Sequence, residues 1–228
     1  VFFEASKYYD EISLSMVPFP KKDSKLGDNN YKKLDFSSKN NFILKAKKLL
    51  EIQNVTLSMH GISHDGFAEF KNQIELSEIL NAKAKLENTF NVEVNTFTPP
   101  NNVLSKHNFF NLVDANFKRI FSAFSNWPHE RPLSYCYIDH FLRSSLLALR
   151  REKGRRIIRN LKYKNIQEYP SFVLYTKSDL NELLNNINKS KIKKDQTIII
   201  ATHFWELWRT HPDQLLSIPN KIRCQNHL

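Results

Sequence analysis

The β-type run Val55-Thr56-Leu57-Ser58-Met59 leads directly into His60-Gly61. Apolar residues at helical spacing follow from Glu75 to Thr89, and a second β-type run extends from Val92 to Phe97. Apolar side chains at every third or fourth position are typical of a helix that covers a core, whereas short runs between turn residues are typical of strands. A strand, a helix and a strand in this order predict a βα unit whose strands lie parallel in one sheet.

The same alternation continues on both sides of this unit. We expect strands at Ile12–Val17, Arg119–Ala123, Phe172–Thr176 and Thr197–Thr202, and helices at Phe42–Ile52, from Ser105 to Asn116, from Asp139 to about Lys153, and from Ser178 or Asp179 to about Ile187. The last strand is a near-continuous apolar run, which is typical of a parallel strand buried on both faces. We therefore predict a single α/β domain over residues 1–228, built on a parallel sheet or barrel.

The composition is that of a globular chain with a sizeable core. Hydrophobic residues make up 41% of the 228 residues, and 17 residues are Phe. Only 4 residues are Gly, and neither GxGxxG nor GxxxxGK[ST] occurs, which argues against a nucleotide-binding phosphate loop. Cys136 and Cys224 are too few for a disulfide framework or a Cys-based zinc site. No apolar run approaches the roughly 20 residues of a membrane helix.

The formal net charge is +11, and the excess of Lys and Arg is spread over most of the chain. Such a spread is typical of a general Lys-rich composition, although a basic surface also attracts anionic polymers. The densest basic cluster runs from Arg150 to Lys164; it offers a possible contact with an anionic surface, or it is a solvated helix end that suits the helix dipole. No nucleic-acid reader motif accompanies the charge, so we expect no nucleic-acid partner.

The ends of the expected strands carry the residues with chemical potential, and in parallel βα architectures the working residues lie at the carboxyl ends of strands. His60 and His64 follow one strand, four residues apart, and two neutral imidazoles at this spacing can share one metal ion. Gly61 and Gly66 frame the pair and favour a loop over a helix. The alternative is a pair of loop histidines without a ligand role.

Two other strand ends add to this pattern. His203 follows the last strand, where an imidazole acts as a general acid or base, or alternatively bonds a neighbouring backbone group. Pro99-Pro100-Asn101-Asn102 follows the strand that ends at Phe97, and forms either a stiff rim that presents amide groups or an ordinary turn.

The order of these segments resembles the NodB-type polysaccharide deacetylases, carbohydrate esterase family four. It resembles most a divergent branch with HG-x-x-H…EF, PP-x-N and TH-[FY]-W segments, which here are His60-Gly61-Ile62-Ser63-His64 with Glu69-Phe70, Pro99-Pro100-Asn101-Asn102, and Thr202-His203-Phe204-Trp205. The resemblance implies a distorted seven-stranded (β/α) barrel whose first strand is missing from this chain.

The resemblance also implies a set of site residues. His60 and His64 match the two histidines that bind one divalent metal ion, usually zinc, and His203 matches the histidine that protonates the leaving amine. Pro100, Asn102 and Trp205 are the expected substrate-binding residues.

The chain departs from the family pattern in two places. The Asp-Asp pair that ends the family's first strand has no counterpart before Ile12, and we expect it upstream of Val1; Asp65 is a weaker candidate for a surrogate carboxylate. Phe97-Thr98 stands where the third motif usually has an Arg.

The resulting hypothesis is a metal-dependent hydrolase that removes an N-acetyl group from an acetylated glycan, with the cell envelope as the compartment that the resemblance suggests. Two alternatives stay open. One is a catalytically inactive barrel that binds a glycan or a protein partner. The other is glycoside hydrolysis, for which Glu69 and Glu206 are the obvious pair of acids.

Overall fold

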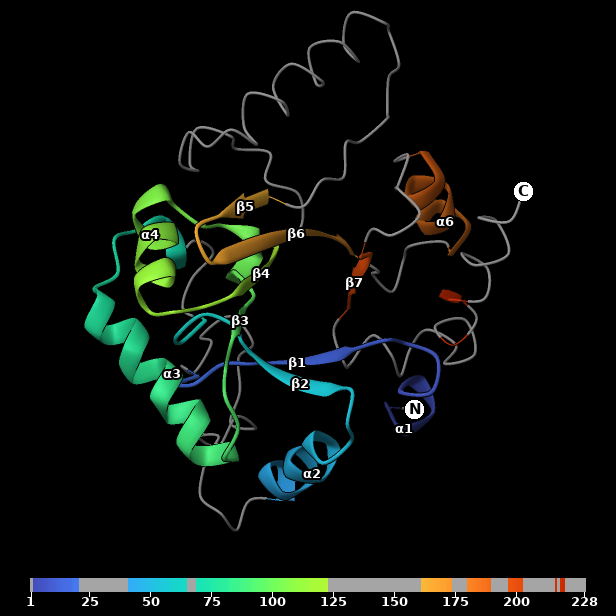
Figure 1. The fold of residues 1–228 in the computed structure, drawn as a ribbon, viewed down its shortest axis with the longest axis horizontal. Coiled ribbons are helices and arrows are strands. Elements are labelled where there is room, and N and C mark those ends of the chain that lie inside the picture. The colour runs from blue at the N-terminus through green and yellow to red at the C-terminus, as the bar shows by residue number, and fades with distance from the viewer. Residues whose placement is uncertain are drawn as a thin grey trace, which may run out of the picture.

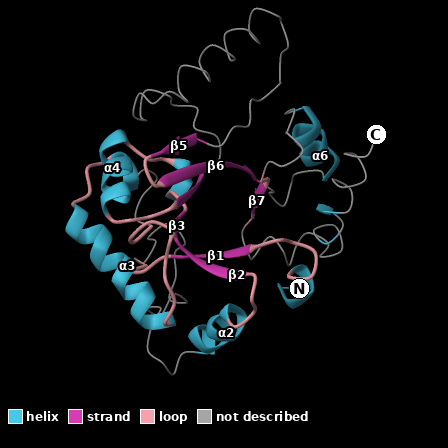
Figure 2. Cartoon of the chain, in the orientation of Figure 1, coloured by secondary structure: helices cyan, strands magenta, loops and turns pink. Residues whose placement is uncertain are grey.

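The computed structural model describes residues 2–20, 41–64, 69–122, 161–173, 180–189, 197–202, 216 and 218–219. Its strands are β1 (Ile12–Met16), β2 (Val55–Met59), β3 (Thr96–Phe97), β4 (Arg119–Ser122), β5 (Leu161–Tyr163), β6 (Ile166–Val173) and β7 (Ile199–Ala201). Its helices are α1 (Phe2–Ala5), α2 (Asn41–Leu50), α3 (Leu76–Phe90), α4 (Lys106–Asp114) and α6 (Leu180–Lys189), with 3₁₀ helices at Glu69–Lys71 and Pro100–Asn102. The helices lie outside a curved sheet (Figures 1 and 2).

The sheet is mostly parallel, as the alternation of strands and helices predicted. The strands β1, β2, β3, β4 and β6 pair in that order, all parallel. Strand β6 also pairs with β5, antiparallel, through residues 166–168, and with β7, parallel, through residues 171–173. Within the described ranges no pairing joins β7 to β1, so the sheet is open there. The α/β class is therefore confirmed, and the closed seven-stranded barrel is not.

Within the described ranges most element boundaries agree with the sequence pattern, and the main differences concern β3 and the hairpin of β5 and β6; the expected helix from Asp139 to about Lys153 lies outside the described residues. The strand expected from Val92 to Phe97 is only Thr96–Phe97 (β3) in the structure. The residues before it do not pair as a strand, because the Val94 amide donates to the Glu87 carboxylate (3.0 Å) instead of to a neighbouring strand. The hairpin of β5 and β6 was not predicted, and β6 begins at Ile166 instead of Phe172. The turn between β5 and β6 contains no Gly. Instead Lys164 takes a positive φ of 49°, a conformation that residues with a side chain rarely adopt.

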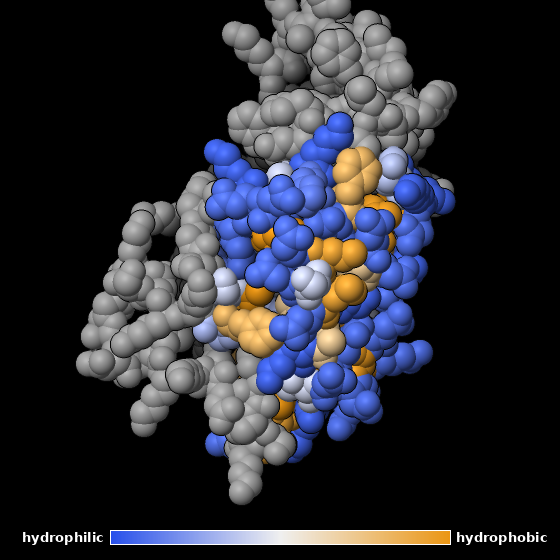
Figure 3. Space-filling model, turned by 90° about the vertical axis from the view of Figure 1, so that its left-hand side faces the viewer, coloured by the Kyte–Doolittle hydropathy of each residue, from blue (hydrophilic) through white to orange (hydrophobic). Residues whose placement is uncertain are grey.

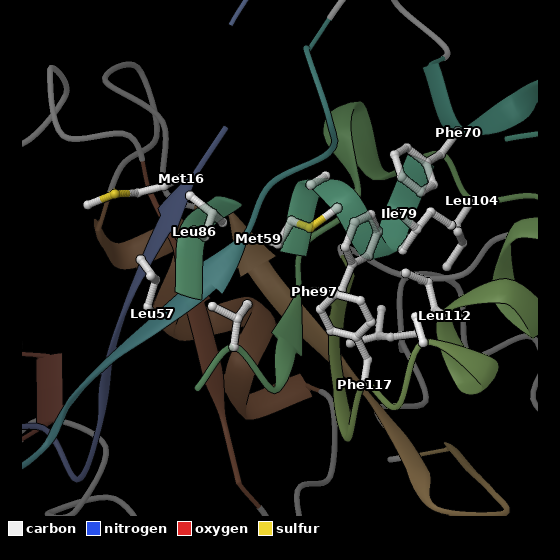
Figure 4. Packing of buried hydrophobic residues seen from close by; sticks show 14 of the residues in the cluster. Met16, Leu57, Met59, Phe70, Ile79, Leu86, Phe97, Leu104, Leu112 and Phe117 are labelled. Carbon is white, nitrogen blue, oxygen red and sulfur yellow. The ribbon is translucent and has the colours of Figure 1, made fainter. Parts of the chain in front are cut away.

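One face of the sheet is mainly apolar and forms the main core, and it also carries a buried polar pair, in which Ser122 Oγ donates to the Glu168 carboxylate at 2.6 Å. Successive side chains of a strand point to opposite faces, so paired residues form rows across the sheet. One such row is Met16, Met59, Phe97 and Ile120, all buried. It packs against apolar residues of α2, α3 and α4, among them Ile43, Ile79, Leu86 and Leu112 (Figure 4).

A second, smaller cluster joins α6 to the end of the sheet. Leu183, Leu184 and Ile187 of α6 pack with Phe172 of β6 and with Ile218. The helices thus cover the apolar face of the sheet and turn polar residues outward. Figure 3, which shows the side of the molecule on which α3 and α4 lie, is mainly hydrophilic with scattered apolar residues. In the part of the chain that the structure describes, no helix combines the length and the apolar character needed to cross a membrane.

The opposite face of the sheet carries a polar row, with the aromatic pair Phe121 and Tyr169 beside it toward the carboxyl ends of β4 and β6. The paired row next to the apolar one is Ser15, Ser58, Thr96, Arg119 and Gln167. The hydroxyls of Ser15 and Ser58 lie 2.6 Å apart, and Arg119 Nε donates to Thr96 Oγ1 at 2.9 Å. A parallel sheet that is buried on both faces has apolar residues on both. This polar row therefore marks a face that is built for polar contacts.

An ion pair spans the polar face at the amino ends of the strands. Arg119 Nη1 and Nη2 donate to the two carboxylate oxygens of Glu11 at 2.6 and 2.7 Å, and Thr56 Oγ1 donates to the same carboxylate at 2.7 Å. Glu11 precedes β1 and Arg119 begins β4, and three strand spacings in a flat sheet amount to about 14 Å. The two side chains meet because the sheet curves toward its polar face.

Candidate functional site

The candidate site lies at the carboxyl ends of β2 and β3. His60 follows β2 and lies two residues beyond Ser58, so the alternation of side chains places it on the polar face. Its amide donates to the Met16 carbonyl at 2.8 Å, and the Thr98 amide donates to the Met59 carbonyl at 2.8 Å. These two bonds continue the β1–β2 and β2–β3 pairing by one residue, so the backbone at His60 is held on both sides.

The imidazole of His60 is oriented by the backbone of the neighbouring strand. Its Nδ1 lies 3.0 Å from the carbonyl oxygen of Thr98. A carbonyl only accepts hydrogen bonds, so Nδ1 carries the proton in the neutral ring and Nε2 keeps the lone pair. This is the arrangement by which proteins orient a metal-binding histidine, because the bond at one nitrogen fixes the ring and the tautomer.

His64 returns to the same place through a tight loop. The ring centroids of His60 and His64 lie 4.9 Å apart, with the ring planes tilted by 56°. His64 takes a left-handed backbone conformation with φ of 53°, and its side chain is exposed whereas His60 is half-buried. The two histidines that the sequence analysis singled out are therefore brought together, by a loop and not by one face of a helix.

Glu69 holds this loop through four hydrogen bonds. Its Oε1 accepts from the amide and the hydroxyl of Ser63, both at 2.7 Å. Its Oε2 accepts from the amides of Ile62 and His64, both at 3.3 Å. A carboxylate has about four acceptor positions, so the loop uses all of them. This engagement weighs against Glu69 as an acid that faces a substrate in glycoside hydrolysis.

Gly61 is required by the packing under the loop. It has a φ of +68°, and a Cβ built on it would lie 2.4 Å from Glu69 Oε2 and 2.4 Å from Pro100 Cγ. Pro100 is buried against this glycine, and its role in binding the substrate stays a prediction. Among the described residues, Pro100 therefore packs against the loop at Gly61.

The remaining predicted site residues fall outside the described ranges. These are Asp65, His203, Trp205 and Glu206 and the side chain of Asn102. The basic cluster is described only from residue 161 on, where Lys162 and Lys164 are exposed. Thr202 follows β7, which runs parallel to β6, so that strand points its carboxyl end to the same edge of the sheet as β2 and β3.

The distance between the two imidazole rings is compatible with a shared metal ion. Two imidazoles on one tetrahedral zinc ion, each bonded at about 2.1 Å, have ring centroids about 5 Å apart, and the observed separation is 4.9 Å. Among the described residues no group of three or more His, Cys, Asp and Glu side chains gathers around one point. A complete ligand set would therefore need donors from outside the described ranges.

The ion pair of Arg119 with Glu11 lies at the other end of the strands. The Arg119 guanidinium, by hydrogen bonding to Glu11, lowers the pKa of that carboxyl below its ordinary value. Burial of the Tyr9 phenol, which precedes β1, raises its pKa. Both groups lie at the amino ends of the strands, so they support the fold and do not belong to the His60–His64 site.

Sequence reasoning missed two groups that build the site, namely the Thr98 carbonyl and the Ser63 hydroxyl. A backbone carbonyl has no signal in the sequence, and Ser63 was read only as a spacer. A comparison of the chain with models of known protein families and with curated protein sequences found no match. The geometry of the site and the sequence pattern therefore carry the functional argument.

Proposed function

We propose that this protein is a metal-dependent hydrolase that removes an N-acetyl group from a sugar or a related amide. The observation that carries the proposal is the orientation of His60: its Nδ1 lies 3.0 Å from the Thr98 carbonyl oxygen, and its ring centroid lies 4.9 Å from that of His64. Orientation of this kind at a strand exit is what a metal-binding histidine needs.

The proposal assigns a role to each residue. His60 and His64 would hold one divalent metal ion, most simply zinc. Such an ion polarises a carbonyl oxygen and lowers the pKa of a bound water. His203 would give a proton to the leaving amine as water adds to the acetyl carbon and the C–N bond breaks, so that acetate and a free amine result. A carboxylate base and a further metal ligand would come from outside the described residues, and Asn102 and Trp205 would contact the sugar.

The proposal extends to the fold and to the place of action. We propose that the open sheet is part of a distorted seven-stranded barrel of the NodB type, in which the polar face lines the interior. The row from Ser15 to Arg119 on that face supports this reading, because a polar interior suits a polar substrate. An acetylated envelope glycan is the substrate class to test first.

The decisive experiment is elemental analysis of the full-length natural protein after zinc is supplied and excess metal is removed. We expect near-stoichiometric metal in the wild type and its loss in His60→Ala/His64→Ala. The matched control is His107→Ala, because His107 is an exposed histidine of α4 that bonds Asn111 (3.1 Å) away from the site. Acetate release from acetylated glycans should follow the metal content. A wild type without metal would sink the hydrolase mechanism and favour an inactive domain that binds a glycan or a protein partner.

A further inference from the structure

We propose that Glu69 is a positioning residue that holds the loop from Ile62 to His64 so that the His64 ring faces the His60 ring. Its importance for metal binding rests on the function proposed above, whereas its hold on the loop does not. Glu69 itself contacts the loop and is not assigned a bond to the metal or to the substrate.

The carboxylate acts on the loop as an anion in a cradle of backbone amides. Three consecutive amides, those of Ile62, Ser63 and His64, point at Glu69 together with the Ser63 hydroxyl. Successive amides converge on one anion only when the chain curls around it. The left-handed φ of His64, 53°, is part of that curl. Without the carboxylate, these amides lose their common acceptor and the strained His64 backbone loses its restraint.

The segment that carries Glu69 is itself anchored in the core. Phe70 is fully buried, and its ring lies 4.7 Å from that of Phe97 in β3. The buried side chain of Asn108 in α4 donates to the carbonyls of Phe70 (2.7 Å) and Asn72 (2.6 Å) and accepts from the Ile74 amide (3.0 Å). The 3₁₀ helix at Glu69 is therefore fixed to both the sheet and α4.

These contacts form a continuous path from the core to the candidate ligands. Helix α4 holds the segment from Phe70 to Ile74, this segment presents Glu69, and Glu69 holds the loop that bears His64. His60 is held separately, by the Thr98 carbonyl. The two imidazoles thus have different hydrogen-bonding supports, the Thr98 carbonyl for the His60 ring and Glu69 for the loop that bears His64. Ordering the ligands before binding reduces the entropy that binding must overcome, so loss of one support should weaken metal affinity.

The test compares the wild type with Glu69→Gln in the full-length protein. Gln has the same shape, but it has only one carbonyl oxygen, and its NH₂ group faces amides that are themselves donors. We expect the Kd for zinc to rise by about 10- to 100-fold, the range found when a supporting hydrogen bond to a ligand is lost. Glu93→Gln is the matched control, since Glu93 is exposed. Ser63→Ala removes only the hydroxyl bond and should give a smaller rise.

A second measurement does not need metal. Amide hydrogen exchange at Ser63 and His64 in metal-free protein should be faster in Glu69→Gln than in the wild type, while exchange at Ile79 and Leu86 in α3 stays unchanged and reports an intact core. Equal exchange at Ser63 and His64, with equal zinc affinity, would overturn the inference. If the wild type binds no zinc, the proposed function fails, and the exchange rates still decide whether Glu69 holds the loop.

Discussion

Replacement of Gly61 by Ala tests how tightly the loop, Glu69 and Pro100 pack together. The added Cβ would lie 2.4 Å from Glu69 Oε2 and from Pro100 Cγ, whereas carbon atoms in ordinary contact lie about 3.5–4.0 Å apart. The Pro100 ring is buried, so it cannot simply swing into solvent. Either this ring or the carboxylate has to move by roughly 1 Å, which strains the hydrogen bonds to the loop.

Two terms contribute to the expected cost. A residue with a Cβ is less stable in the left-handed region by about 1–2 kcal/mol. This cost applies at position 61, because Gly61 has a φ of +68°. Overpacking of a closed site adds about 1–3 kcal/mol. We therefore expect Gly61→Ala to lower the free energy of unfolding by about 2–5 kcal/mol, measured by urea denaturation at constant m-value.

Asn91→Ala separates the two terms. Asn91 also has a positive φ, 56°, at the carboxyl end of α3, and it is exposed, so this variant carries the backbone strain without the collision. It should cost about 1–2 kcal/mol at most. If Gly61→Ala destabilises the protein no more than Asn91→Ala does, the packing of Gly61 against Glu69 and Pro100 is wrong.

Three further predictions concern the fold that supports the site. Asn108→Ala should lower the free energy of unfolding in urea by about 2–3 kcal/mol, because the buried Ile74 amide loses its acceptor and the Phe70 carbonyl keeps only the Ser105 amide as a donor; a loss below about 1 kcal/mol would contradict this role of Asn108. Phe97→Ala should cost about 3–5 kcal/mol, since it opens a cavity among fully buried rings, and a near-neutral result would argue against this core. Arg119 lowers the pKa of Glu11 from an ordinary value of 4.5, so the ion pair stabilises the fold fully above that pH and its contribution is lost as the pH falls through the lowered pKa. The free energy of unfolding should fall by about 1 kcal/mol more between pH 6 and pH 3 in the wild type than in Arg119→Met. An equal fall in both proteins would show that the ion pair does not stabilise the fold.

Much of the fold was predictable from local patterns. The sequence predicts a strand from Val55 to Met59 and a helix from Ser105; the structure has the same strand, and Ser105 caps helix α4, with its Oγ accepting from the Asn108 amide at 3.3 Å. Capping and hydrophobic spacing act over a few residues, so they leave a direct trace in the sequence. The hairpin at Lys164 leaves no such trace, because its turn uses a residue that rarely takes a positive φ.

The candidate site was predictable only in part. The spacing of His60 and His64 and the position of Gly61 indicated a loop that carries two potential ligands. The groups that hold the two histidines were not predictable. The Thr98 carbonyl, which holds the His60 ring, follows the next strand, and Glu69, which holds the loop at Ser63, belongs to a segment that α4 holds. Thr98 lies 38 residues from His60, and Asn108 lies 38 residues from Phe70, so these two contacts join residues that are distant along the chain, and a single sequence records the residues without the pairing.

The sequence by itself determined the alternation of strands and helices, and hence the parallel sheet and the edge at which His60 emerges. Only the tertiary structure decided which face of the sheet is polar, how far it curves and that it stays open between β7 and β1 within the described ranges. The physical reason is one of range. Strand and helix preferences are local, whereas curvature is a property of several strands together, as the contact of Glu11 with Arg119 across β1 to β4 shows.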